Sequence, residues 1–264
     1  MERLLRRARD FASRVFLRLS LRPSTHGGDL VRLGTDYGGW WVPRGLAAPG
    51  TVAYCAGAGE DVSLDIALHD AGCEVTVFDP TPRAIAYVER HAPTGPRFRF
   101  VPIGWWDEET ELRFFAPRDP AHVSHSVVNL QATSEYFMAQ VKPVDVLMRD
   151  LGDDHVDLIK MDIEGAEYAV IDSLLERGPQ PIALCVEFDQ PEPIVRTIRA
   201  VRKLREAGYA LVKIERWNYT FVRSPTDSVR RALTVAFAVP DASRAGAIAR
   251  RVVRMQKSSR VGPC

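Results

Sequence analysis

Three carboxylates and a glycine follow an apolar run near the middle of the chain. The run at 158–161 ends at Asp162, and Glu164, Gly165 and Glu167 then open a helical pattern. Parallel strands of α/β proteins present ligand-binding groups at their carboxyl ends, so this spacing predicts acidic side chains beside a ligand, with Asp162 at the strand tip. The alternative is that Asp162 and Glu164 cap the following helix, whose N-terminus favours acids.

A second candidate for ligand binding is the sequence Gly-Ala-Gly-Glu-Asp at 57–61, between a predicted strand and a predicted helix. Gly57 and Gly59 allow a sharp turn and the close approach of a ligand to the backbone. Asp79 follows Gly59 by 20 residues, at the end of the next predicted strand, which is the usual place for a carboxylate that binds ribose hydroxyls. The combination predicts a nucleoside site, whereas the glycines alone would also fit a tight turn.

The charge of this loop discriminates between adenosine cofactors. A dinucleotide fingerprint has a third glycine where this chain has Val62. Pyrophosphate prefers the positive N-terminus of a helix, and Glu60 and Asp61 at that end would repel it. The same carboxylates suit a sulfonium or ammonium group, so the loop favours S-adenosyl-L-methionine over a nicotinamide dinucleotide.

Four segments resemble the FkbM-type S-adenosylmethionine-dependent methyltransferases. They lie at 57–63, 78–83, 123–126 and 160–168, and the last matches the signature Lys-x-Asp-x-Glu-Gly-x-Glu. The resemblance spans about residues 26–222 and implies O-methylation of a hydroxyl group on a small-molecule acceptor, a sugar or a secondary metabolite. A nicotinamide-dependent oxidoreductase and a non-catalytic interaction protein on the same fold are the alternatives.

Two residues compete for the role of general base. His125 lies in a polar loop, and imidazole titrates near neutral pH, which suits removal of a hydroxyl proton. Asp189 follows an apolar strand, at a position where the FkbM-type family commonly has histidine. Asp162, Glu187 and Asp189 could instead gather a divalent cation, but no metal-ligand spacing supports this and no metal is predicted. The predicted catalytic residues are therefore His125, Asp162 and Asp189, and the predicted cofactor-binding residues are Gly57, Gly59, Glu60, Asp61, Asp79 and Asp162.

Alternating strands and helices are predicted to position these groups. Strands are expected at 51–55, 74–78, 97–103, 156–161 and 182–188, helices at 60–71, 82–91 and 194–207, and an antiparallel pair at 209–214 and 219–222. This order predicts an α/β fold with a doubly wound, Rossmann-like methyltransferase sheet, mostly parallel with an antiparallel edge. A hairpin is expected over 31–42, and a small extension with its own strand at 111–115 is followed by a loop.

Charge is distributed unevenly along the 264 residues. The formal net charge is +1, but residues 1–25 carry +5 and residues 224–264 carry +6, which leaves −10 for residues 26–223. Three parts are therefore expected: a basic N-terminal helix (1–25), a methyltransferase domain (26–223) and a basic C-terminal extension (224–264). The acidic middle part argues against a nucleic-acid partner, because phosphates require a basic surface.

The N-terminal segment reads as a basic amphipathic helix. Apolar residues recur at helical spacing, with arginines opposite them, at Leu4, Ala8, Phe11, Val15 and Leu19. Such a helix packs on the core or on a second subunit of a homo-oligomer, and the alternative is a peripheral contact with an anionic membrane surface. No apolar run is long enough to span a bilayer, no secretory signal is evident and the four cysteines show no metal spacing, so a cytoplasmic protein is expected.

Overall fold

The computed structural model describes residues 2–24, 28–119, 124–129, 131–188 and 194–223, with the backbone alone for residues 2–8. Its largest sheet has seven strands in the order β11-β12-β10-β9-β3-β4-β5. They are β3 (Val52–Ala56), β4 (Glu74–Phe78), β5 (Phe98–Val101), β9 (Leu158–Met161), β10 (Ala183–Glu187), β11 (Tyr209–Glu215) and β12 (Asn218–Arg223). The middle strands pair in parallel, and β12 pairs antiparallel with both β10 and β11. The predicted mostly parallel sheet with an antiparallel pair at one edge is confirmed.

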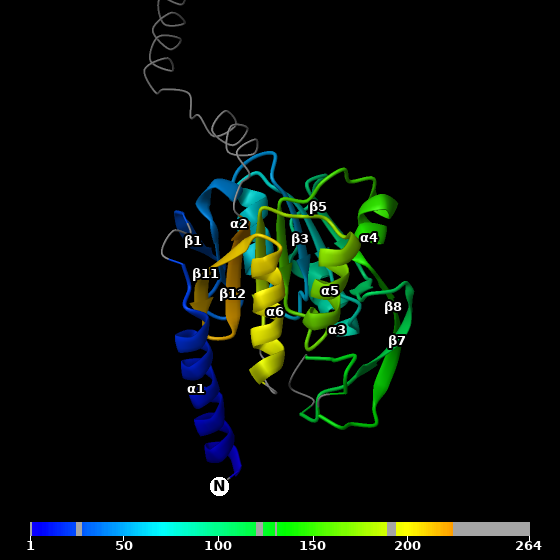
Figure 1. Ribbon diagram of the computed structural model, residues 1–264. Helices are drawn as coiled ribbons and strands as arrows, with labels where there is room; N and C mark the ends of the chain where they lie inside the picture. The colour runs from blue at the N-terminus through cyan, green and yellow to red at the C-terminus, as the bar shows by residue number, and fades with distance from the viewer. Residues whose placement is uncertain (1, 25–27, 120–123, 130, 189–193, 224–264) are drawn as a thin grey trace, which may run out of the picture. The chain divides into compact units, whose positions relative to one another are not determined.

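Helices cover both faces of this sheet (Figure 1). They are α2 (Ser63–Asp70), α3 (Pro82–His91), α4 (Val144–Leu151), α5 (Glu167–Arg177) and α6 (Ile194–Glu206). Successive strand residues point to opposite faces, so Tyr54 belongs to one core with α4, α5 and α6, and Cys55 belongs to a second core with α2 and α3. This two-sided burial is the doubly wound arrangement that the alternating pattern predicts.

Two smaller sheets flank the large one. The predicted hairpin forms from β1 (Leu30–Leu33) and β2 (Trp40–Pro43), which pair antiparallel. The extension is a three-stranded sheet of β6 (Gly104–Trp105), β7 (Thr110–Phe115) and β8 (Tyr136–Lys142), in the order β6-β8-β7. The strand β7 was expected, but the prediction of a loop where β8 lies is wrong.

The N-terminal helix α1 (Glu2–Leu21) is present as predicted, but Phe11, Val15 and Leu19 of its predicted apolar stripe face solvent. Within residues 9–21, the part of α1 whose side chains are described, the buried residues are Ser13, Leu17 and Leu21, and α1 contacts α6. Phe11 and Leu19, from the predicted inward stripe, are exposed. The expectation that this stripe packs on the core of the same chain is therefore wrong. No helix among the described residues combines the length and apolar character needed to cross a bilayer.

Candidate active site

The end of β3 is pinned to its two neighbouring strands. Gly57 donates a backbone hydrogen bond to the carbonyl of Phe78 (2.9 Å), and the amide of Asp162 donates one to the carbonyl of Ala56 (3.1 Å). Gly57 has a φ of 84°, and a Cβ built on it would lie 1.7 Å from the carbonyl oxygen of Asp162. No other residue fits this position without moving the backbone, because both the φ and the contact exclude a side chain.

The buried carboxylate of Asp79 organises the loop that follows. Its Oδ2 accepts hydrogen bonds from the amides of Ala58 (2.9 Å) and Gly59 (3.0 Å), and its Oδ1 accepts two from Thr81, from the amide (2.8 Å) and from Oγ1 (2.7 Å). A carboxylate offers about four acceptor sites, so the loop itself occupies the set. Asp79 therefore shapes the glycine loop, and ribose hydroxyls would have to replace one of these contacts to bind it.

Lys160 joins β9 to the same loop. Its buried ammonium donates hydrogen bonds to the carbonyls of Gly57 (2.5 Å) and Ala56 (3.2 Å), and lies 3.7 Å from Oδ2 of Asp162. Burial opposes the charged form, but the neighbouring carboxylates of Asp162 and Asp65 outweigh it and raise the pKa of Lys160 above its ordinary value. The result is a permanent positive charge beneath the glycine loop.

The turn after β9 is held by a second buried carboxylate. Glu167, 1% exposed, accepts hydrogen bonds from the amides of Ile163 (2.8 Å) and Gly165 (2.8 Å). Glu164 has a φ of 54°, a left-handed conformation that is unfavourable for residues other than glycine. The N-cap of α5 is Ala166, and the acid in its first turn is Glu167. The carboxylate that serves this turn is therefore that of Glu167, and not Asp162 or Glu164 as the capping alternative supposed.

The loop that carries His125 is anchored beside this turn. Oγ of Ser126 donates a hydrogen bond to the carbonyl of Glu164 (2.6 Å), and Ser126 pairs with Phe115 through two backbone hydrogen bonds. The imidazole of His125 meets the ring of Phe137 edge-on at a centroid distance of 5.3 Å. The predicted rival base, Asp189, lies outside the described residues.

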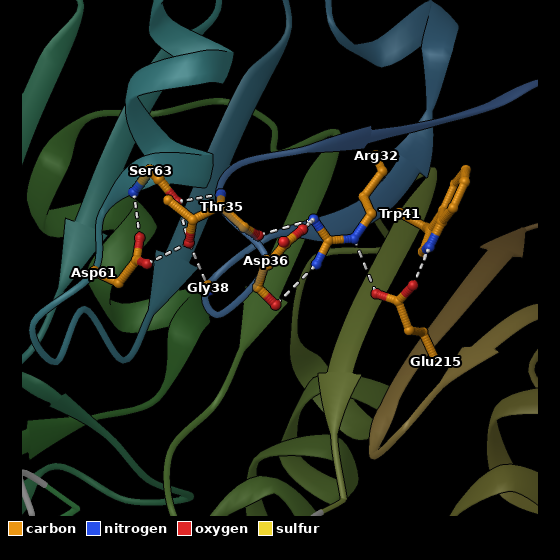
Figure 2. A network of polar contacts seen from close by, with 8 residues as sticks. All are labelled: Arg32, Thr35, Asp36, Gly38, Trp41, Asp61, Ser63 and Glu215. Atoms are coloured by element: carbon orange, nitrogen blue, oxygen red, sulfur yellow. Dashed lines mark hydrogen bonds and ion pairs between the residues drawn. The ribbon is translucent and has the colours of Figure 1, made fainter.

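Asp61 links the glycine loop to the hairpin between β1 and β2. Its Oδ1 accepts a hydrogen bond from the amide of Ser63 (2.8 Å), and its Oδ2 accepts one from Oγ1 of Thr35 (2.6 Å), as Figure 2 shows. Burial opposes the charge, but these hydrogen bonds from Ser63 and Thr35 lower the pKa of Asp61. The predicted helix start at residue 60 is wrong, because α2 begins at Ser63 after this turn. The first amide of α2 is already bound by a carboxylate, which leaves it unavailable to a phosphate.

The same hairpin also contacts the end of β11. The carboxylate of Glu215 accepts a hydrogen bond from Nε of Arg32 (3.0 Å) and one from Nε1 of Trp41 (2.9 Å), also drawn in Figure 2. The guanidinium of Arg32 also donates to the carbonyls of Thr35 (2.8 Å) and Asp36 (3.2 Å). The hairpin therefore connects the loop after the central strand β3 with the end of the edge strand β11, two places that are distant in sequence.

A cavity of about 240 Å³ lies between these loops. All the predicted site residues that the structure describes line it: Gly57, Gly59, Glu60, Asp61, Asp79, His125 and Asp162. Glu60 lies at its exposed edge, where it pairs with Arg83 (2.8 Å). The sequence did not indicate that Lys160 and Tyr37 also line the cavity. Tyr37 lies in a turn, outside any alternating or helical pattern of apolar residues, so hydrophobic periodicity could not indicate its place in the cavity.

The lining of the cavity is predominantly acidic, with eight Asp or Glu residues against Arg32, Lys160 and Arg216. Partial desolvation of its hydroxyl group, together with the charges of Asp162, Glu187, Glu164 and Asp61, raises the pKa of Tyr37 above its ordinary value, although the residue as a whole is exposed. Four carboxylates thus act together on one hydroxyl group at the cavity rim. Among the described residues, no group of three or more histidine, cysteine or acidic side chains could hold a metal ion.

Comparison with known proteins gives one match to a family and several weak matches to structures. A model described as "Methyltransferase FkbM domain" matches residues 53–211. No curated protein sequence matches significantly. A putative RNA methyltransferase from Pyrococcus horikoshii is 14% identical, over 68% of this chain and 76% of that chain, with a TM-score of 0.37. Precorrin-6y C5,15-methyltransferase from Geobacter metallireducens GS-15 is 14% identical, over 68% and 85%, with a TM-score of 0.35. Scores this low carry no conclusion about activity.

Proposed function

Because the chain belongs to the FkbM methyltransferase family, we propose that it transfers the methyl group of S-adenosyl-L-methionine to a hydroxyl group of a small acceptor, a sugar or a secondary metabolite. The observation that carries this proposal is the predominantly acidic lining of the cavity at the carboxyl ends of β3, β4 and β9. A sulfonium and an ammonium group are both cations, so this cavity favours the methyl donor over a pyrophosphate cofactor.

The residues present fit such a cofactor. Gly57 and Gly59 would let the cofactor approach the backbone closely, and Asp79 holds the loop that contains them in one conformation. Asp61 and Asp162 supply negative charge on the two sides of the loop. Asp61 also occupies the first amide of α2, which removes the anion site that a dinucleotide needs. The nicotinamide alternative is therefore disfavoured by the same contact.

The protein's own contribution to the reaction is positioning and proton removal. When bound, the cofactor supplies the methyl group on its sulfonium sulfur. Holding the acceptor oxygen in line with that group contributes on the order of 7–11 kcal/mol to lowering the barrier. We assign the removal of the hydroxyl proton to His125, whose ring lines the cavity beside the turn after β9. A general base adds about 10²–10⁴-fold to the rate. Asp162, at the end of β9, would add a further negative charge near the sulfonium group.

The experiment that tests this function separates binding from turnover. Calorimetry should show that S-adenosyl-L-homocysteine binds the wild-type protein and that NAD does not. The variant His125→Ala should keep the affinity for S-adenosyl-L-homocysteine and lose about 10²–10⁴-fold in turnover with a hydroxyl acceptor that supports methylation. The matched control is His155→Ala, because His155 is mostly exposed and does not line the cavity.

Two results would contradict these assignments. Binding of NAD in place of S-adenosyl-L-homocysteine would overturn the methyltransferase assignment. An unchanged rate in His125→Ala with intact cofactor binding would move the role of base to Asp189. The net charge of −10 on residues 26–223 makes a small acceptor the first class to screen, ahead of nucleic acid.

A further inference from the structure

The helix α1 presents two different faces. Its inner face, formed by Ser13, Leu17 and Leu21, is buried against the rest of the chain. Its outer face exposes large apolar side chains to solvent: Phe11 (63% exposed), Val15 (41%), Phe16 (52%) and Leu19 (69%). Each of these four would ordinarily be buried in a globular protein, and here they are neighbours on one surface.

The two faces lie on opposite sides of the helix. Successive residues of an α-helix turn by about 100°, which places Leu19 about 160° from the buried Leu17. The four outer apolar residues and Ala12 fill one continuous arc of about 140°, with no charged residue inside it. The same rotation places Arg18 at one edge of the arc and Arg9 at the other, and both are exposed. This pattern, an apolar face bordered by arginines, is typical of helices that lie in a lipid interface.

The inner face is fixed, so the outer face is held toward solvent. The guanidinium of Arg14 lies over the indole of Trp217, 5.6 Å from the ring centroid. Arg205 donates a hydrogen bond to the carbonyl of Leu21, and the amide of Ser24 donates one to the carbonyl of Leu211 (2.7 Å). The helix could not rotate its apolar arc inward without breaking these contacts.

Charge decides which partner suits the outer face. A second copy of this chain would bring another segment of net charge +5 against the first, and residues 224–264 of the same chain carry +6. Both would repel the arginines that border the arc. An anionic surface with an apolar interior complements both features. We propose that α1 is a membrane-docking helix, which binds the surface of anionic phospholipid bilayers by inserting its outer face among the headgroups.

Vesicle flotation with the full chain tests this proposal. Wild-type protein should float with vesicles of phosphatidylcholine and phosphatidylglycerol, and not with vesicles of phosphatidylcholine alone. The triple variant Phe11→Gln/Phe16→Gln/Leu19→Gln should bind at least about tenfold more weakly, because it loses three inserted side chains. It keeps every charge of the chain, so electrostatic binding by residues 224–264 cannot produce this loss. Glutamine is a good helix former, so α1 should persist, as circular dichroism can verify.

Further variants keep the test decisive. Val195→Gln is the matched control, since Val195 is 55% exposed on another helix, α6, and its replacement should leave flotation unchanged. Arg9→Gln/Arg18→Gln should weaken binding about fivefold for each arginine, and added salt should weaken it further in the wild type. If the triple variant loses its fold, this double variant alone carries the test.

Three outcomes would overturn the proposal. Wild-type protein that does not float with anionic vesicles lacks the activity. Equal flotation of the wild-type protein and the triple variant would assign binding to charge elsewhere in the chain. A wild-type dimer that the triple variant converts to a monomer, measured by light scattering, would identify a second copy as the partner. None of these measurements depends on methyl transfer, so this proposal and the proposed function fail independently.

Discussion

Two sides of the cavity are built in different ways. The strand-end loops, at 57–61 and 162–166, are held by the buried carboxylates of Asp79 and Glu167. Together these carboxylates accept six hydrogen bonds, five from backbone amides and one from a hydroxyl group. The hairpin turn at 34–39 is held by partly exposed contacts through Asp61 and Glu215. Its ion pair between Arg32 and Asp36 spans 3.9 Å, with the Asp36 side chain fully exposed.

This difference separates what is fixed from what can adapt. Removing a buried carboxylate leaves backbone amides unsatisfied at a cost of about 1–3 kcal/mol each, so the strand-end loops have one stable conformation. Exposed ion pairs contribute less than about 1 kcal/mol, so the hairpin turn can be altered at little cost. On the proposed function, we therefore expect the strand-end loops to hold the methyl donor and the hairpin turn to border the acceptor.

The largest effect is expected for Gly57→Ala. Its Cβ would meet the carbonyl oxygen of Asp162 at 1.7 Å, so the free energy of unfolding should fall by more than about 4 kcal/mol and binding of S-adenosyl-L-homocysteine should disappear. Gly50→Ala is the matched control, because Gly50 has the same kind of φ (85°) with no atom within 4 Å. It should lose only about 1–2 kcal/mol. Similar losses of stability for the two variants in denaturant titrations would show that the contact between Gly57 and the carbonyl of Asp162 does not exclude a side chain.

The variant Glu167→Gln should destabilise the protein by about 2–4 kcal/mol. It replaces a charged acceptor of two amide hydrogen bonds by a neutral amide that can accept at only one oxygen. Affinity for S-adenosyl-L-homocysteine should fall as the turn at 162–166 loses its support. Glu176→Gln, on the exposed side of the same helix, should stay within about 0.5 kcal/mol of the wild type. Calorimetry and thermal unfolding measure both effects.

A smaller effect is expected for Glu215→Gln, on the hairpin side. Stability should fall by less than about 1 kcal/mol, because the carboxylate is partly exposed. The KM for the acceptor should rise several-fold while the affinity for S-adenosyl-L-homocysteine is kept. Asp29→Asn breaks an exposed pair with Arg44 at the other end of the hairpin and should leave both parameters unchanged. A lowered cofactor affinity in Glu215→Gln would break the distinction between the two sides.

The smallest expected effect is a loss of stability at acidic pH. Hydrogen bonds from Trp41 and Arg32, working against burial, lower the pKa of Glu215, as those from Ser63 and Thr35 do for Asp61. A carboxylate with a lowered folded-state pKa stabilises the protein above its unfolded pKa, about 3.9 for Asp and 4.3 for Glu, and loses this contribution as the pH falls through the folded value. The stability gap between the wild type and Asp61→Asn/Glu215→Gln should therefore be constant near neutral pH and close below about pH 4. A gap that persists below that pH would contradict the assigned pKa directions.

Much of the fold could be predicted from the sequence because apolar runs and glycines are direct signals. The five parallel strands follow short apolar runs, and Gly57 and Gly59, which both have positive φ, mark the loop after β3. The strand β8 was missed because Tyr136 and Met138, on its exposed side, are apolar as well, so the alternation of Phe137, Ala139 and Val141 does not stand out in the sequence. The start of α2 was placed too early because the turn through Asp61 depends on hydrogen bonds from Thr35 and Ser63.

Tertiary contacts explain the other differences at the site and at α1. The amides of Ala58 and Gly59 donate hydrogen bonds to the carboxylate of Asp79, and no sequence pattern reveals such partners. In α1 the more apolar side of the helix faces solvent, so amphipathicity alone indicates the wrong orientation. Leu17 and Leu21 decide the docking because their neighbours in the body include α6, which is distant in sequence.

The construction of the hairpin turn also indicates where directed evolution of the acceptor range should start. A saturation library would spare Gly38 and Gly39, because a Cβ at either position would lie 2.4 Å from an atom of Asp61 or Thr35. Asp36 and Tyr37 line the cavity and are exposed, so they tolerate many replacements. Because two positions allow about 400 amino-acid combinations, a library of a few hundred clones at Asp36 and Tyr37 is of the same size as the set of combinations. New acceptor preferences obtained there would leave the machinery for the methyl donor untouched.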